Sequence, residues 1–156
     1  MNETNILVTG GSGVIGQELI NILLGEGANV LTADKEQYPD SQLESVQEVV
    51  IDLEQDNLDV IREFEPEVVF HLAASFERTA ESSGFWEDNW RNNTLLTHRI
   101  ANLINDLSSV RTAVFASSYL VYDADEYLSP IEPNQPTLID EEQSIQPRNL
   151  CGASKY

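Results

Sequence analysis

The stretch that most constrains the fold lies near the N-terminus, where an apolar run leads into closely spaced glycines. Residues 6–9 predict a buried strand, and residues 17–24 carry apolar side chains at helical spacing. The glycines between them fit G-x-G-x-x-G at Gly11, Gly13 and Gly16, or G-x-x-G-x-x-G when counted from Gly10. Strand, glycine turn and helix in this order are typical of backbone contact with a pyrophosphate, because a Cβ would block the approach. A plain turn between strand and helix is the alternative at this point.

Composition favours a single globular domain and argues against two classes of partner. The chain has 156 residues, of which 41% are hydrophobic, enough for one domain with a sizeable core. Its net charge of −19 argues against nucleic acid or an anionic membrane, since both favour basic surfaces. No apolar run reaches the ~20 residues of a membrane helix, and the N-terminus lacks a signal-peptide layout. With one cysteine, Cys151, we expect no internal disulfide and a cytoplasmic location, and no metal site is predicted.

A second strand, residues 28–33, ends in Asp34, about 20 residues after the glycine turn. Dinucleotide-binding folds place an acid there to accept hydrogen bonds from the adenosine ribose. A carboxylate at this position repels a 2′-phosphate and so favours NAD over NADP, and Lys35 beside it weakens that preference slightly. A simple strand-end turn residue is the alternative role for Asp34.

Strands and helices alternate along the rest of the chain. We expect strands at 48–51, 67–72 and 110–116, helices at 58–64 and 85–107, a loop or poorly formed helix at 35–46, a loop at 75–84 and an irregular linker at 129–136. The predicted apolar face of the long helix comprises Trp90, Leu96, Ile100, Leu103, Ile104 and Leu107. We expect His71 to be a satisfied histidine at a strand end and His98 to lie on the polar face of that helix.

This alternation predicts an α/β fold, a doubly wound parallel sheet with flanking helices and the strand order 3-2-1-4-5. Ligands of such sheets bind at the carboxyl ends of the strands. The glycine turn, Asp34, Asp52, Ala73 and Ala74 all fall at predicted strand ends, which supports one shared binding site.

Four motifs in the same order resemble a known family. They are residues 9–16, the His-Leu-Ala-Ala of 71–74, the Ser-Ser-Tyr-Leu-Val-Tyr-Asp of 117–123 and residues 147–155. Together they resemble the extended short-chain dehydrogenase/reductases, the NAD-dependent epimerase/dehydratase family that acts mainly on nucleotide sugars. The resemblance covers essentially the whole chain and implies a Rossmann-type fold that binds NAD. The cofactor-binding positions it implies are Gly10, Gly13, Val14, Ile15, Gly16, Asp34, Lys35, Asp52, Leu53, Leu72, Ala73, Ala74, Ser117 and Lys155.

The resemblance also implies catalytic positions. The family's Ser or Thr, three residues before the Val of a Val-Tyr-Gly signature, matches Ser118. The lysine of its Y-x-x-x-K motif matches Lys155, which would hold the nicotinamide ribose and lower the pKa of a neighbouring acid. The family also has an asparagine near the start of the long helix, and Asn89, Asn92 and Asn93 all lie close to that position.

One motif position departs from the family, because the tyrosine of Y-x-x-x-K is Cys151 here. That tyrosine exchanges a proton with the substrate while hydride moves to or from the nicotinamide. A thiol exchanges protons too, but it is shorter than a phenol by several ångströms. Tyr156 and Tyr122 are candidate substitutes within the chain, but neither matches the motif. Three alternatives stay open: another acid supplied by substrate or a further segment, Cys151 itself, or NAD binding without turnover. A buried apolar cysteine is the default for a lone one.

A second departure is length, because family members carry further strands and a C-terminal substrate domain. We therefore expect residues 1–156 to be the truncated NAD-binding domain of a nucleotide-sugar epimerase or dehydratase, inactive on its own. The alternatives are an NAD-binding module with a regulatory or scaffolding role and an NAD-dependent reductase of a non-sugar alcohol or ketone. The long helix is a candidate surface for a homodimer.

Overall fold

The computed structural model describes residues 4–39, 46–76, 84–125 and 138–156. Five parallel strands form one sheet in the order β3-β2-β1-β4-β5, as the sequence predicts. Their bounds are Asn5–Thr9 for β1, Asn29–Asp34 for β2, Val46–Val50 for β3, Val68–His71 for β4 and Thr112–Phe115 for β5. In the register of the sheet Thr9 pairs with Ala33 on one side and His71 on the other, so three strands end at one edge.

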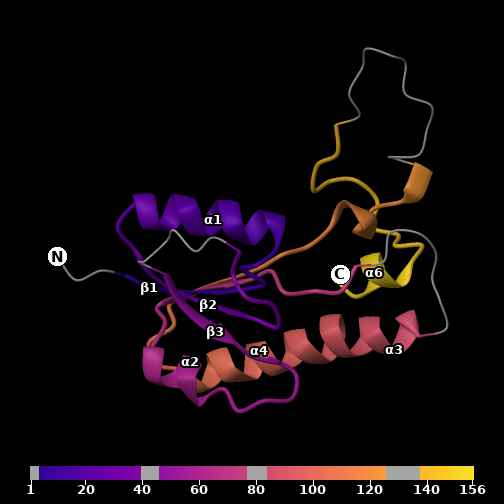
Figure 1. Ribbon diagram of the computed structural model, residues 1–156. Coiled ribbons are helices and arrows are strands. Elements are labelled where there is room, and N and C mark those ends of the chain that lie inside the picture. Colours follow the sequence, from indigo (N-terminus) through magenta and orange to yellow (C-terminus); the bar gives the residue numbers. More distant parts are fainter. Residues whose placement is uncertain (1–3, 40–45, 77–83, 126–137) are drawn as a thin grey trace.

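Helices cover both faces of the sheet (Figure 1). Helix α1 (Val14–Gly25) lies on one face, and α2 (Asp59–Phe64) and α4 (Leu96–Asp106) lie on the other. Side chains along β1 point alternately to the two faces of the sheet and so contribute to the hydrophobic core on each face. Ile6 and Val8 pack on the side of α1, and Leu7 packs on the side of α2 and α4. The central strand is therefore buried on both faces, as a parallel sheet requires.

The long helix predicted at 85–107 forms as α3 (Phe85–Asn89), a π-helical segment η1 (Trp90–Leu95) and α4. Leu96, Ile100 and Leu103 are buried as expected, but Trp90 is 50% exposed, so its assignment to the apolar face is wrong. The buried stripe continues instead through Asn93 and Asn89, whose polar side chains a hydrophobic pattern cannot detect. His98 is exposed and hydrogen-bonded to Asn102, as predicted.

The segment after β5 is less regular. Its described residues include a 3₁₀ turn η2 (Tyr119–Val121) and a short helix α6 (Leu150–Ala153), and Tyr122 and Ile145 form an isolated bridge. Lys155 lies in the turn after α6, not in the first turn of a helix, because the helix has already begun at Leu150. All four residues of β5 are exposed at the sheet edge.

Some expectations fall outside the described residues. The linker at 129–136, the part of the 35–46 segment from residue 40 to 45 and most of the 75–84 loop are among them. Across the described ranges, no helix is both long and apolar enough to cross a membrane.

Candidate functional site: a dinucleotide pocket and a neighbouring catalytic end

The glycine turn is held by close backbone contacts. Gly10 has a φ of +76°, and a Cβ built on it would lie 2.6 Å from the backbone nitrogen of Ala73. A Cβ on Gly16 would lie 2.3 Å from the carbonyl oxygen of Gly10. At Gly13 the nearest atom would be that same oxygen at 3.4 Å, an ordinary contact. The fold therefore excludes a side chain at Gly10 and Gly16, whereas Gly13 is exposed and leaves room for a ligand beside it.

Helix α1 presents its N-terminus beside this turn. Its N-cap is Gly13, whose residue type provides no capping side chain, and its first turn holds no acidic residue. The first N–H groups of such a helix are free to bind a phosphate, and the helix dipole favours negative charge there. Val14 and Ile15 are exposed at 81% and 72% at the same end. The helix end thus offers backbone N–H donors to a bound anion, with exposed apolar side chains beside them.

Asp34 closes the turn from the end of β2. Its Oδ2 accepts hydrogen bonds from the backbone N–H of Ser12 at 3.1 Å and from the Ser12 hydroxyl. Its Oδ1 accepts one from the backbone N–H of Glu36 at 3.3 Å. The carboxylate is half-buried, so its orientation is fixed while part of it remains open to a ligand.

A pocket of about 250 Å³ joins these features at the carboxyl ends of the strands. Its walls are Gly10, Ser12, Gly13, Asp34, Lys35, Ile51, Leu53, Leu72, Ala73, Ala74, Ser75, Asn92 and Leu96. Eight of these were predicted from the sequence. The others predicted for the cofactor lie outside this wall: Val14, Ile15, Gly16, Asp52, Ser117 and Lys155. Sequence reasoning missed Ser12, Ile51, Ser75, Asn92 and Leu96 as wall residues, although Ser12 stands within the glycine motif.

Asp52 lies at the edge of this pocket and is tied to it through Lys35. The Lys35 Nζ is 3.4 Å from Asp52 Oδ2 and donates to Asn92 Oδ1 at 3.0 Å. Burial opposes ionisation of Asp52, but the backbone N–H of Glu54 and the Lys35 ammonium outweigh it and lower the pKa of the carboxyl. Residues from β2, the loop after β3 and the long helix are thereby joined across one end of the pocket.

A second cavity, of about 220 Å³, lies at the ends of β4 and β5. Its walls are His71, Thr97, Phe115, Ala116, Ser117, Ser154, Lys155 and Tyr156. His71 is 1% exposed; its Nδ1 is 2.7 Å from Thr9 Oγ1, and its Nε2 is 3.3 Å from Thr97 Oγ1. Burial and the nearby Lys155 charge lower the pKa of His71 to about 4. The expectation of a satisfied strand-end histidine is confirmed.

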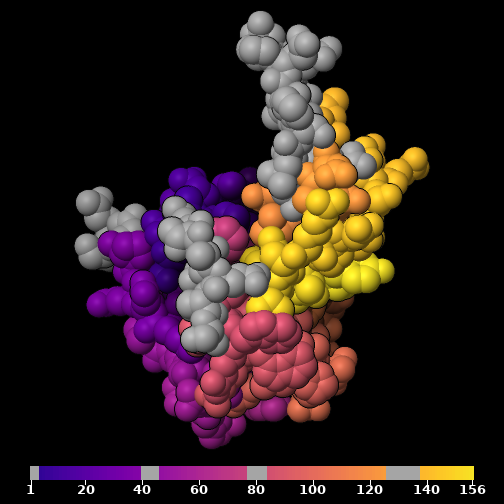
Figure 2. Space-filling model, turned by 90° about the vertical axis from the view of Figure 1, so that its right-hand side faces the viewer, coloured from indigo at the N-terminus to yellow at the C-terminus, as the bar shows by residue number. Residues whose placement is uncertain are grey.

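The candidate catalytic residues lie on η2 and in and after α6. Ser118 caps η2, because its Oγ accepts a hydrogen bond from the Leu120 backbone N–H at 3.2 Å. The two elements pack closely at Gly152, where a Cβ would lie 2.1 Å from the Leu120 carbonyl oxygen. Figure 2 shows the yellow C-terminal residues lying directly against the coral surface of the long helix.

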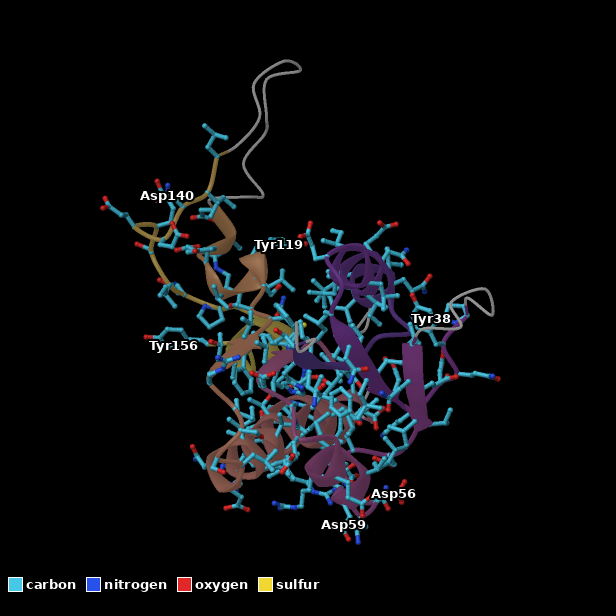
Figure 3. All side chains as sticks on the ribbon, turned by 90° about the vertical axis from the view of Figure 1, so that its left-hand side faces the viewer. Tyr38, Asp56, Asp59, Tyr119, Asp140 and Tyr156 are labelled. Carbon is cyan, nitrogen blue, oxygen red and sulfur yellow. The ribbon has the colours of Figure 1, made fainter. Side chains whose placement is uncertain are left out.

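Cys151 and Lys155 influence each other electrostatically. Cys151 is 8% exposed, and burial raises the pKa of its thiol although the Lys155 charge opposes this. The expected lowering of a thiol pKa beside the lysine is therefore wrong, because burial outweighs the charge. Burial likewise lowers the pKa of the Lys155 ammonium. Tyr156 is 81% exposed and projects away from the fold (Figure 3).

Asn93 links the dinucleotide pocket to α6. It is fully buried; its Oδ1 accepts from the Ser75 backbone N–H at 2.8 Å, and its Nδ2 donates to the Ser75 carbonyl at 3.1 Å. The same Nδ2 donates to Ser154 Oγ at 3.3 Å. Of the three asparagines left open by the sequence, Asn92 lines the pocket and Asn93 braces it. Both stand in the π-helical segment η1.

A parallel sheet with a glycine turn and a strand-end acid at the point where its strand order reverses defines a dinucleotide-binding α/β domain. A model of the NAD-dependent epimerase/dehydratase family matches residues 6–156. The chain therefore belongs to that family, whose cofactor is NAD. The uncapped helix end, the open space at Gly13 and the half-buried Asp34 fit this cofactor.

Solved structures agree with this assignment. A UDP-galactose 4-epimerase is 30% identical with a TM-score of 0.74, and the match covers 97% of this chain and 48% of that one. MoeE5, crystallised with UDP-glucuronic acid and NAD, is 29% identical with a TM-score of 0.76, over 97% of this chain and 46% of that one. The epimerase Mth375 of Methanothermobacter thermautotrophicus is 27% identical with a TM-score of 0.79, over 99% and 45%. The chain spans about half the length of these structures. A comparison with curated protein sequences finds no match.

Proposed function

We propose that this chain is the NAD-binding part of an NAD-dependent epimerase or dehydratase that acts on a nucleotide sugar. The observation that carries the proposal is the pocket that joins the glycine turn to Asp34 at the carboxyl ends of the strands. The solved relatives add support for the substrate class, since their titles name UDP-sugars or a UDP-galactose epimerase.

Different residues of this chain bind different parts of the cofactor. The N–H groups at the start of α1 bind the pyrophosphate, and Asp34 accepts hydrogen bonds from the adenosine ribose hydroxyls, replacing its contact with Ser12. Lys155 contacts the nicotinamide ribose. Bound NAD would supply a reversible hydride acceptor for a sugar carbon.

Proton handling is where this chain departs from its family. Ser118 holds the reacting hydroxyl through its own O–H and its second lone pair, since the Leu120 N–H occupies only one lone pair of its Oγ. Cys151 keeps its proton at neutral pH because burial raises its pKa, so it is a poor general base. A second candidate function follows from this burial: an NAD-binding module whose role is regulatory, with no turnover by the usual route.

The test separates binding from turnover. Native mass spectrometry and an NAD titration of the purified protein come first, and we expect one NAD per chain. UDP-glucose and UDP-galactose are then added to the NAD-loaded protein, in its form with all segments that accompany this chain, and conversion is followed by chromatography. Conversion of either UDP-sugar by the wild type supports the proposal that the protein is an enzyme.

The variant Cys151→Tyr restores the family's acid, and Cys151→Ala is the matched control that keeps the site apolar. NAD binding without conversion in the wild type, together with conversion by Cys151→Tyr alone, would favour the binding module as the natural role. Failure to bind NAD would contradict both functions.

A further inference from the structure

Lys35 offers a positive charge where a dinucleotide-binding fold distinguishes NAD from NADP. It follows Asp34 directly, and both line the pocket. A lysine beside the ribose acid would attract the 2′-phosphate of NADP if its ammonium were free. Its Nζ is instead engaged by Asp52 at 3.4 Å and by Asn92 at 3.0 Å.

Asp52 is a fixed partner for this lysine. Its Oδ1 accepts a hydrogen bond from the Glu54 backbone N–H at 2.9 Å, and its Oδ2 accepts one from Gln55 Nε2 at 3.1 Å. Its own backbone N–H donates to Asp56 Oδ2 at 2.8 Å. With several donors arranged on the carboxylate, it stays ionised at neutral pH.

The loop that carries Asp52 is itself fastened to the long helix. Arg99 on α4 donates from Nη1 to the Leu53 carbonyl at 2.6 Å and from Nη2 to the Asp56 carbonyl. The carboxylate therefore has a set position, whereas the lysine side chain is half exposed and flexible. The position of the Asp52 carboxylate therefore determines where the Lys35 ammonium lies.

We propose that Asp52 determines the choice of cofactor by holding Lys35 on Asn92 and away from the 2′ position of the adenosine ribose. Asp34 repels a 2′-phosphate directly, and Asp52 removes the cation that would compensate for this repulsion. This inference rests on the dinucleotide site proposed above, and it assigns Asp52 a role in the choice between NAD and NADP.

The test measures dissociation constants of NAD and NADP for the same protein and compares their ratio, Kd of NADP over Kd of NAD. Asp52→Asn keeps the size of the side chain and removes the charge that pairs with Lys35, which leaves the ammonium with only the neutral Asn92 amide. We therefore expect the ratio to fall about five-fold, the scale of one partly exposed ion pair. The double variant Lys35→Met/Asp52→Asn should return the ratio to its wild-type value. Glu54→Gln is the matched control, since it removes a charge from the same loop whose ion pair is with Arg91.

A fall of the same size in Glu54→Gln or in the double variant would overturn the proposal, because it would indicate a general effect of charge. An unchanged ratio in Asp52→Asn would overturn it too. Lys35→Met alone provides a check that does not depend on folding of the Asp52 variant: we expect no change in the ratio, and a rise would mean that the lysine already serves NADP. Wild-type protein that binds neither dinucleotide would contradict the dinucleotide site itself.

Discussion

The dinucleotide pocket and the catalytic end at residues 117–156 are built in different ways. At the pocket, three strands end together and the glycine turn packs backbone against backbone, at distances that leave no room for side chains at Gly10 and Gly16. At the candidate catalytic end, Ser118 caps a 3₁₀ turn, Cys151 lies in α6 and Lys155 lies in the turn after α6.

This difference explains why the two regions tolerate changes of sequence to different degrees. Cofactor binding depends on main-chain geometry, which many sequences provide, so the fold is recognised at sequence identities near 30%. In the function proposed above, proton transfer would depend on the identity of one side chain. Cys151 stands in α6, at the position that the resemblance assigns to the family's tyrosine, and we expect this difference to change the chemistry.

The largest expected effect concerns the close backbone contacts of the glycine turn at the dinucleotide pocket. Gly16→Ala places a Cβ 2.3 Å from the Gly10 carbonyl oxygen. To remove this steric clash, the helix α1 must move away from the glycine turn. We expect the free energy of unfolding to fall by about 3 kcal/mol or more, measured by urea denaturation. Gly25→Ala is the control on the same helix, because nothing lies within 4 Å of its Cβ, and it should be neutral or gain up to about 1 kcal/mol. Equal losses in both variants would show that helix α1, not the glycine contact, is the sensitive element.

A second prediction concerns the boundary between the two ends, where His71 joins β1 to α4. Its pKa is about 4 when folded against an ordinary value of 6.5, so between these values the unfolded chain binds more protons and stability falls as pH is lowered. His71 should account for about 2 kcal/mol of stability lost between pH 7 and pH 4.5.

His71→Gln isolates that contribution, since carboxylates also titrate in this range. The variant should lose less stability than the wild type between the two pH values, whatever its stability at pH 7. Parallel urea denaturation curves at both pH values measure the difference. Identical losses in the two proteins would mean that His71 is not the group that titrates.

Local patterns account for what the sequence predicts well. Strand, glycine turn and helix are encoded within a few residues, and Asp34 follows at a set distance, so these pocket residues are predictable from local pattern. The alternation of strands and helices predicts the strand order, whereas Leu53 and Leu72 come from the family resemblance. The contributions of the long helix are not predictable in this way, because Asn92 and Leu96 lie 58 and 62 residues after Asp34 in the sequence and reach the pocket only through the fold. Buried Asn89 and Asn93 also read as surface residues in a hydrophobic pattern, which placed Trp90 wrongly on the apolar face.

The last prediction concerns the side chain that we expect to recognise the ribose. Asp34→Ala removes the acceptor for two ribose hydroxyls and leaves Ser12 without its partner, so NAD binding should weaken by about 1–3 kcal/mol. Isothermal titration with NAD measures the loss, and Glu36→Ala, which removes a nearby exposed charge, should bind NAD as the wild type does. Full affinity in Asp34→Ala would mean that the main chain of the turn binds the dinucleotide alone. The contrast between the two ends would then be complete, with a cofactor site specified by backbone and a catalytic site specified by side chains.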